Sequence, residues 1–224
     1  MEIERRYTSG DTGKAELRAD DGQKRIGGYA ATFNRQSKNL GGFIEVVDPI
    51  AFNQSRGDGW PDVIARYNHD DMALLGTTAA GTLRMGLDSY GLSYDVVPPS
   101  SMAYVAELVE RGDVRKSSFA FRTIDDDWST TDQGYPLRRL TAVQLIDVAP
   151  VNTPAYADTS AGLRSLAAKF DADVEEVRSM AKADELRKFF VRTDGPQPKK
   201  VAKKGMFGPA AAAALLARRE DPYV

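Results

Sequence analysis

The sequence predicts a β-rich α+β fold, in which many short strands form a small barrel or sandwich with helices flanking it. Apolar runs with the period of a strand recur from Ile26 to Val151. A single stretch with helical periodicity, residues 101–111, interrupts them. After Thr159 the apolar residues change to helical spacing. We therefore expect a strand-rich domain followed by a helical C-terminal extension.

The composition narrows the class of protein. With 224 residues and no cysteine, the chain suits one domain with appendages and lacks thiol nucleophiles, disulfides and thiolate metal sites. Its net charge of −2 gives no general attraction to nucleic acid or to an anionic membrane. No apolar run approaches the roughly 20 residues that span a bilayer, and the N-terminus does not resemble a secretion signal. We expect a soluble protein made in the cytoplasm.

Strands are expected along most of the first part of the chain. Residues 1–24 are polar, and we expect only the first few to pair, as an edge strand, with the rest in a loop. Further strands are predicted at residues 26–33, 43–47, 62–67, 82–87 and 91–97. The last two flank residues 88–90 and are expected to form a hairpin. If the strand at 62–67 runs on, His69 continues the parity of its apolar face.

One helix is expected between the strands, from Ser101 to Arg111. Ser100 or Ser101 is a suitable N-cap, and Gly112 is suited to the left-handed end. Strands are then predicted at residues 117–124 and 137–151, with a polar loop between them.

The C-terminal part is expected to be helical and partly flexible. Asp173 resembles a helix start, and apolar residues follow at helical spacing to about Arg192. Residues 194–198 read as a linker, and the Ala-rich run at 210–219 favours a further helix. We therefore expect a domain at residues 1–165 and an extension at 166–224.

The single histidine, His69, limits the catalytic chemistry that the chain can perform. Serine hydrolases use a proton shuttle that works near neutral pH, and imidazole is the usual one. His69 would then be the base, and Ser118, in the string Ser117–Phe121, is the best hydroxyl nucleophile. The alternatives are a solvated turn histidine and an ordinary strand serine. One imidazole beside two carboxylates does not predict a metal site.

Asp147 is a candidate for the group that orients the histidine. It lies between apolar residues in 145–148, and an unpaired buried carboxylate is costly. Its partner can be an arginine, Arg138 or Arg139, in a structural ion pair. It can equally be the second ring nitrogen of His69, and the residues alone leave both alternatives open.

A series of short strings resembles one known family. They are Gly28–Asn34, Leu40–Glu45, Asn68–Asp70, Leu75–Thr77, Gly81–Leu83, Gly91–Tyr94, Arg111–Val114, Ser118–Phe121 and Pro154–Tyr156. They run in order over about residues 26–165, and with them the chain resembles the HK97-type phage prohead proteases. These capsid maturation enzymes are serine peptidases with a fold like that of the herpesvirus assemblins. The resemblance implies a closed or partly closed barrel of about six to eight strands.

The resemblance also implies roles for three residues. His69 matches the catalytic histidine in the family's Asn-His-Asp string, and Ser118 matches the nucleophile in its Ser-Phe-x-Phe string. Asp147 falls where family members tend to carry a glutamate. Herpesvirus relatives use a second histidine as the third residue, which this chain lacks. No cofactor and no metal are implied. For the oxyanion we consider backbone N–H groups of Asn152–Tyr156 first, and Arg138 and Arg139 second.

The function implied is that of a serine endopeptidase. It would cleave the major capsid protein, its scaffold segment and itself during phage prohead maturation, inside the assembling prohead in the host cytoplasm. We expect a homodimer, with no membrane and no nucleic acid as partner. Residues 166–224 are expected to be a delivery segment that the enzyme later removes. The alternatives are a catalytically inactive assembly or scaffold protein of the same fold, a protease fused to a scaffold-like tail, and, more distantly, a sugar- or nucleic-acid-binding barrel.

Overall fold

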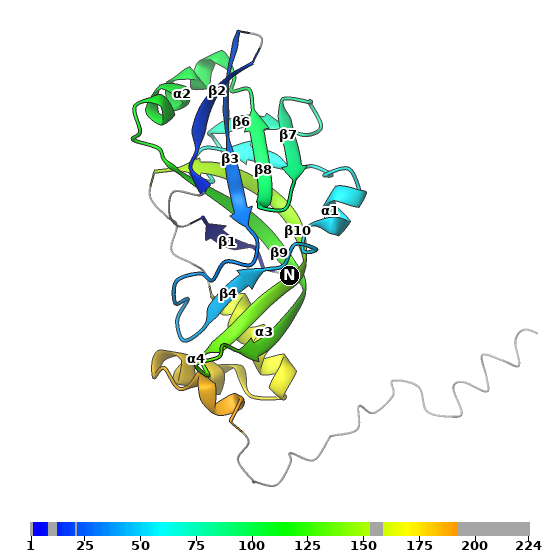
Figure 1. Ribbon diagram of the computed structural model, residues 1–224, viewed down its shortest axis with the longest axis vertical. Coiled ribbons are helices and arrows are strands. Elements are labelled where there is room, and N and C mark those ends of the chain that lie inside the picture. Colours follow the sequence, from blue (N-terminus) through cyan, green and yellow to red (C-terminus); the bar gives the residue numbers. More distant parts are fainter. Residues whose placement is uncertain (1, 9–12, 21, 153–158, 192–224) are drawn as a thin grey trace, which may run out of the picture. The chain divides into compact units, whose positions relative to one another are not determined.

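The computed structural model describes residues 2–8, 13–20, 22–152 and 159–191. Their strands form two sheets, one of six strands and one of four (Figure 1). The first has the order β1-β9-β10-β5-β6, and β4 also pairs with β10. The second has the order β2-β3-β8-β7. The strands are β1 (Glu4–Tyr7), β2 (Glu16–Asp20), β3 (Gln23–Thr32), β4 (Ile44–Val47), β5 (Ile64–Arg66), β6 (Leu74–Thr77), β7 (Leu83–Leu87), β8 (Gly91–Val96), β9 (Lys116–Thr130) and β10 (Pro136–Val151).

The prediction of a strand-rich α+β fold is confirmed. A closed barrel is not found in the part of the chain that the structure describes, where the strands are arranged in these two sheets. The predicted edge strand near the N-terminus, the strand at 43–47 and the hairpin around residues 88–90 are all present.

A long antiparallel hairpin of β9 and β10 is the central element of the larger sheet (Figure 1). The prediction of a polar loop after residue 124 is wrong for residues 125–130, because β9 continues to Thr130. Strand pairing to β10 stabilises this polar stretch, and Trp128 is buried at its end.

The segment before residue 24 also differs from the predicted loop. The loop expected before residue 24 contains β2, whose polar residues pair with β3 in a hairpin. Gly22 has a φ of 78° in the turn, which glycine adopts without steric strain. Two short elements, helix α1 (Asn53–Gly57) and strand β6, were not predicted from the sequence, because neither is long enough to show a period.

The predicted helix before β9 is confirmed as a 3-10 turn, η2 (Ser100–Met102), that leads into α2 (Ala103–Glu110). The serine cap is wrong: Met102 occupies the N-cap position of α2, and no side chain caps either helix. Gly112 has a φ of 83°, as the left-handed end requires.

Among the described residues, three helical elements follow β10: α3 (Ser160–Phe170), α4 (Val174–Lys182) and η3 (Leu186–Phe189). Asp173 caps α4 as predicted, accepting bonds from two backbone N–H groups. The helical spacing to about Arg192 does not form one continuous helix. α4 ends at Lys182, and Asp184, with a φ of 57°, separates it from η3. The predicted domain edge at residue 165 falls inside α3. Residues 194–219 lie outside the described residues.

Two apolar clusters form the core. The larger lies between the two sheets and α2, and the smaller joins the three C-terminal helical elements to Phe43 and Trp128. No helix of the described residues is long and apolar enough to cross a membrane.

A buried charge network ties β1 to the larger sheet. Glu4 and Arg6 of β1, Glu45 of β4 and Arg138 of β10 form ion pairs of 2.7–2.9 Å, and all four side chains are buried. Burial by itself raises the pKa of Glu4, but the bonds to Arg138 and the charge of Arg6 outweigh it and lower that pKa below its usual value. The network therefore holds β1 through charged groups that depend on one another.

Candidate active site

Ser118 lies on β9, beside the edge strand. Its register partners are Tyr7 of β1 and Ala149 of β10. The alternation of a strand places Ser118 and Ala120 on one face, opposite the stacked rings of Phe119 and Phe121. The sheet around Ser118 therefore fixes the direction of its hydroxyl.

Ser117 has a different environment from its neighbour. Its Oγ lies 3.1 Å from the hydroxyl of Tyr94, and both side chains are buried. Burial raises the pKa of Tyr94, so this hydroxyl pair stays neutral. Ser117 points away from His69 and forms part of the packing between the sheets.

His69 lies in a tight turn after β5, and not on an extended strand. The condition under which His69 would continue the strand parity is not met, because β5 ends at Arg66 and both Asn68 and His69 take left-handed φ values of 56° and 57°. The turn is fastened to the end of β10. The N–H of Asn68 donates to the Pro150 carbonyl and its Oδ1 accepts from the N–H of Asn152, both at 3.1 Å.

A β-bulge in β10 decides where Asp147 points. Leu145 is opposite Phe121, but Asp147 is opposite Ala120, so one extra residue is inserted between them. Without the bulge, Asp147 would share the face of the phenylalanines; with it, Asp147 shares the face of Ser118. The bulge thus turns a carboxylate toward the histidine.

The three predicted residues form one chain of hydrogen bonds. Nδ1 of His69 lies 2.5 Å from Oδ1 of Asp147, and Nε2 of His69 lies 2.6 Å from Oγ of Ser118. The His69 and Asp147 side chains are only 3% and 2% exposed. A hydroxyl, an imidazole and a carboxylate in this order are the arrangement that makes a serine hydroxyl nucleophilic.

Asp147 has a cationic partner as well as the histidine. Its Oδ2 lies 3.5 Å from Nη1 of Arg66. The arginines considered from the sequence are engaged elsewhere: Arg138 in the buried network, and Arg139 with Asp48 and Asn34. The structure therefore combines the two alternatives for Asp147, with a different arginine.

The comparison with protein families agrees with this geometry. Residues 13–172 match the model of the caudovirus prohead serine proteases. The chain belongs to this family. It is therefore a serine peptidase, a hydrolase of phage capsid maturation that acts within the assembling capsid and interacts with capsid proteins. The matched region contains Ser118, His69 and Asp147, and leaves out β1. Searches of curated proteins and of solved structures found no match.

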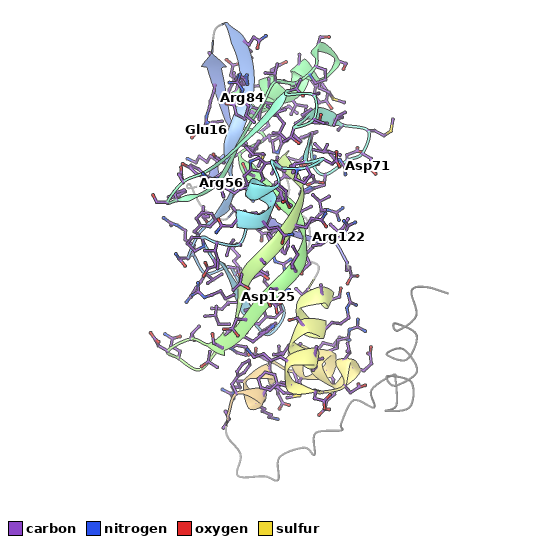
Figure 2. All side chains as sticks on the ribbon, turned by 90° about the vertical axis from the view of Figure 1, so that its right-hand side faces the viewer. Glu16, Arg56, Asp71, Arg84, Arg122 and Asp125 are labelled. Atoms are coloured by element: carbon purple, nitrogen blue, oxygen red, sulfur yellow. The ribbon has the colours of Figure 1, made fainter. Side chains whose placement is uncertain are left out.

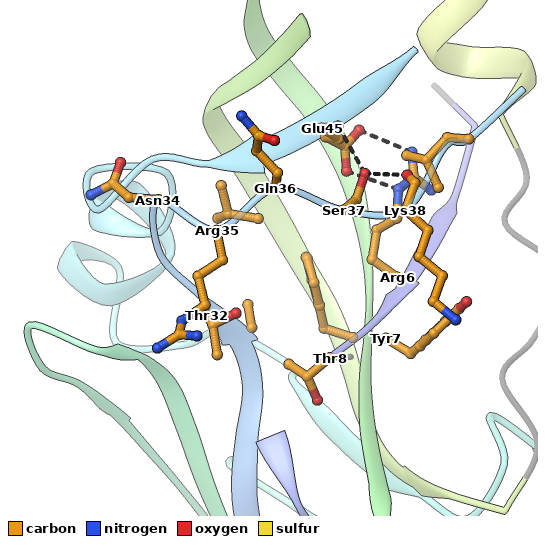
Figure 3. Close-up of a pocket in the computed structure, with 14 residues that line it drawn as sticks. Arg6, Tyr7, Thr8, Thr32, Asn34, Arg35, Gln36, Ser37, Lys38 and Glu45 are labelled. Carbon is orange, nitrogen blue, oxygen red and sulfur yellow. Dashed lines mark hydrogen bonds and ion pairs between the residues drawn. The ribbon is translucent and has the colours of Figure 1, made fainter. Parts of the chain in front are cut away.

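A pocket of about 530 Å³ lies beside β1 (Figure 3). Residues Arg6–Thr8 form one wall, and the segment Asn34–Lys38 forms another. The paired side chains of Arg6 and Glu45 lie at its side (Figure 3). None of the three hydrogen-bonded residues lines it, so this pocket adjoins the candidate site without containing it.

Two contacts of the site were missed from the sequence, those of Arg66 and of the Arg6 backbone. The need of a buried carboxylate for a cation was recognised, but sequence separation does not show which arginine is near. The carbonyl of Arg6 lies 2.8 Å from Ser118 Oγ, and a backbone atom has no motif by which it could be found.

Proposed function

We propose that Ser118 is the nucleophile, His69 the general base and Asp147 the residue that orients the imidazole. Ser118 Oγ attacks the scissile carbonyl carbon and forms the new C–O bond while its proton passes to Nε2 of His69. The imidazolium then gives this proton to the departing amine nitrogen as the C–N bond breaks. Water, deprotonated by the same imidazole, attacks the acyl carbon, the ester bond to Ser118 Oγ breaks, and Oγ takes the proton back from His69 as the carboxylic acid product leaves. The hydrogen-bonded chain of the three side chains carries this proposal.

For the oxyanion we propose backbone N–H groups of the segment after β10. The N–H of Asn152 already donates to Asn68, and Pro154 has no N–H, which leaves Thr153, Ala155 and Tyr156 as the candidates. These positions lie outside the described residues. Arg138 is a poor second candidate, because its guanidinium is engaged by Glu4, Glu45 and Asp126. Removing such a donor typically costs about 3 kcal/mol of transition-state stabilisation.

We propose the major capsid protein, its scaffold segment and the chain itself as substrates, cleaved in the prohead within the host cytoplasm. Membership of the prohead protease family supports this choice. We also propose a homodimer, which light scattering of the purified Ser118→Ala protein tests: a mass of twice the chain is expected, and a monomer would overturn it.

The test is intact-mass spectrometry of the major capsid protein of the same phage, co-expressed with this chain. We expect a shortened capsid subunit with the wild type and a full-length subunit with Ser118→Ala. Ser129→Ala is the matched control, because Ser129 is an exposed residue of the same strand, and it should cleave normally. Full-length subunits with the wild type, in assembled heads, would favour the inactive scaffold protein instead.

We propose that the C-terminal extension delivers the enzyme to the assembling shell. Truncation tests where the extension begins. Leu166, Val177 and Leu186 are buried together with Trp128, so a chain that ends at residue 165 should lose stability. A chain that ends at Val191 should keep its stability and its cleavage of purified capsid protein, but should fail to enter heads. Normal head entry without residues 192–224 would contradict the delivery role.

A further inference from the structure

Arg66 links the candidate site to the protein surface. It is the last residue of β5, and its Nη1 lies 3.5 Å from Oδ2 of Asp147 and 2.6 Å from Oδ1 of Asp71. Asp147 is buried, Arg66 is 20% exposed, and Asp71 is 83% exposed. Asp71 accordingly lies at the edge of the molecule (Figure 2). A row of alternating charges thus runs from solvent to the imidazole.

We propose that Arg66 is a positioning residue for the peptidase reaction, and that Asp71 orients Arg66. This inference rests on the proposed function of Ser118, His69 and Asp147. Arg66 holds Oδ2 of the carboxylate so that Oδ1 keeps facing Nδ1 of His69. It touches neither the nucleophile nor the imidazole in the structure, and it acts only through Asp147.

The need for this cation follows from burial. Asp147 has two oxygens, and one bond to an imidazole satisfies only one of them. A buried carboxylate without further compensation is costly and is free to rotate or to take up a proton. Arg66 compensates the second oxygen. Parallel pairing of β5 with β10 sets Ile64 opposite Asp147. Arg66, at the end of β5, therefore lies near the carboxylate, and His69 follows three residues later in the turn.

The length of the contact shows what kind of interaction it is. A distance of 3.5 Å is long for a hydrogen bond between an arginine and a carboxylate. The attraction between the two charges therefore matters more than the paired, bidentate hydrogen bonds that a guanidinium can form. A lysine at position 66 should therefore replace much of the effect. The contact with Asp71 is shorter, but an exposed ion pair contributes little to stability. Its main effect is to limit where the Arg66 side chain can lie.

The experiment compares initial rates of cleavage of purified major capsid protein by full-length Arg66→Gln, Arg66→Lys and Asp71→Asn proteins. We expect Arg66→Gln to lower kcat by about 10- to 100-fold with little change in KM, because the base is misplaced while substrate contacts remain. Arg66→Lys should recover most of this loss, and Asp71→Asn should show a smaller loss. Arg84→Gln is the matched control, an exposed strand arginine that should behave as wild type.

A spectroscopic measurement separates positioning from a merely structural effect. Because the chain has a single histidine, a ¹⁵N-labelled, tag-free protein gives one set of imidazole signals. We expect the Nδ1 proton of His69 to give a resolved downfield resonance in the wild type and in Arg66→Lys, and an exchange-broadened one in Arg66→Gln.

The outcomes distinguish this inference from the proposed function. Normal kcat and an unchanged Nδ1 resonance in Arg66→Gln, while Ser118→Ala is inactive, would overturn the role of Arg66 alone. Equal losses in Arg66→Gln and Arg66→Lys, accompanied by a lower Tm, would show a structural role and also overturn it. If Ser118→Ala cleaves as well as the wild type, the proposed function itself fails.

Discussion

The hydroxyl of Ser118 donates a hydrogen bond of 2.8 Å to the backbone carbonyl of Arg6. A serine hydroxyl has one proton, and Nε2 of His69 lies 2.6 Å from the same oxygen. While that proton points to the carbonyl of Arg6, it cannot pass to Nε2 of His69. Deprotonation of Ser118 by His69 therefore requires the hydroxyl to turn from β1 to the imidazole. Because Ser118 is also buried, the structure shows a resting arrangement in which the site is closed.

The closed site makes a cysteine at position 118 slow to react. Ser118 is 2% exposed, and the chain has no cysteine of its own, so alkylation of Ser118→Cys by iodoacetamide reports this position alone. We expect the folded protein to react at least about 10-fold more slowly than the urea-unfolded chain, because reagent access requires local opening. Ser129→Cys, exposed on the same strand, should show little difference between the two states. Equal rates at position 118 would mean that the site is open.

Removal of the Asp147 charge should abolish most of the activity without unfolding the protein. Asp147→Asn keeps the shape of the side chain but lets it donate to Nδ1, which favours the wrong tautomer of His69. We expect a fall in kcat of about 10⁴-fold, measured as cleavage of purified capsid protein. Asp125→Asn, an exposed change on β9, is the control. Retention of a tenth of the wild-type rate would remove Asp147 from the mechanism.

The left-handed turn at residues 68–69 predicts separate effects for two substitutions at Asn68. Alanine loses the acceptor for the Asn152 N–H and adopts the left-handed region with a penalty of about 1–2 kcal/mol. Glycine also loses this acceptor, but it adopts the left-handed region without the steric penalty. We expect Asn68→Ala to lower the free energy of unfolding more than Asn68→Gly, and both to lower kcat. Asn34→Ala has the same backbone penalty at a φ of 53°, and it should lower stability without lowering kcat.

The charge network around β1 predicts an acid-sensitive contribution to stability. The pKa of Glu4 is lowered from its ordinary value of 4.5 in the folded chain. A lowered folded pKa contributes stability that is complete above 4.5 and is lost as the pH falls through the folded pKa. Urea unfolding of the wild type should therefore show a free energy of unfolding that falls between pH 5 and pH 3. In Glu4→Gln this free energy should fall less over the same pH range.

The same substitution should be destabilising at neutral pH. Glu4→Gln leaves Arg6 and Arg138 buried with less compensation, and breaking a buried pair in this way costs about 3 kcal/mol or more. Glu16→Gln on β2, an exposed glutamate (Figure 2), is the control and should change neither quantity. An equal pH slope in wild type and Glu4→Gln would show that other carboxylates carry the acid sensitivity.

Many of the strand positions could be predicted from the sequence, because apolar alternation is a local property. The hairpin at residues 83–96 and the strand at 44–47 follow from it. Polar strands could not be predicted in this way. β2 and residues 125–130 of β9 are extended because a neighbouring strand supplies their hydrogen bonds, and a neighbour in space leaves no local pattern.

The sequence by itself determined the chemistry that was available: one imidazole, no thiol, and a serine and a carboxylate on strands near it. The geometry was decided by the tertiary structure. A bulge of one residue turns Asp147 to the face of Ser118, and a left-handed turn fastened to β10 presents His69 between them. The first depends on the register of β10 against β9, its neighbour in the hairpin, and the second on the pairing of β5 with β10, which is distant in the chain. A shift of one residue reverses the face of a side chain, and only the assembled sheet fixes that register.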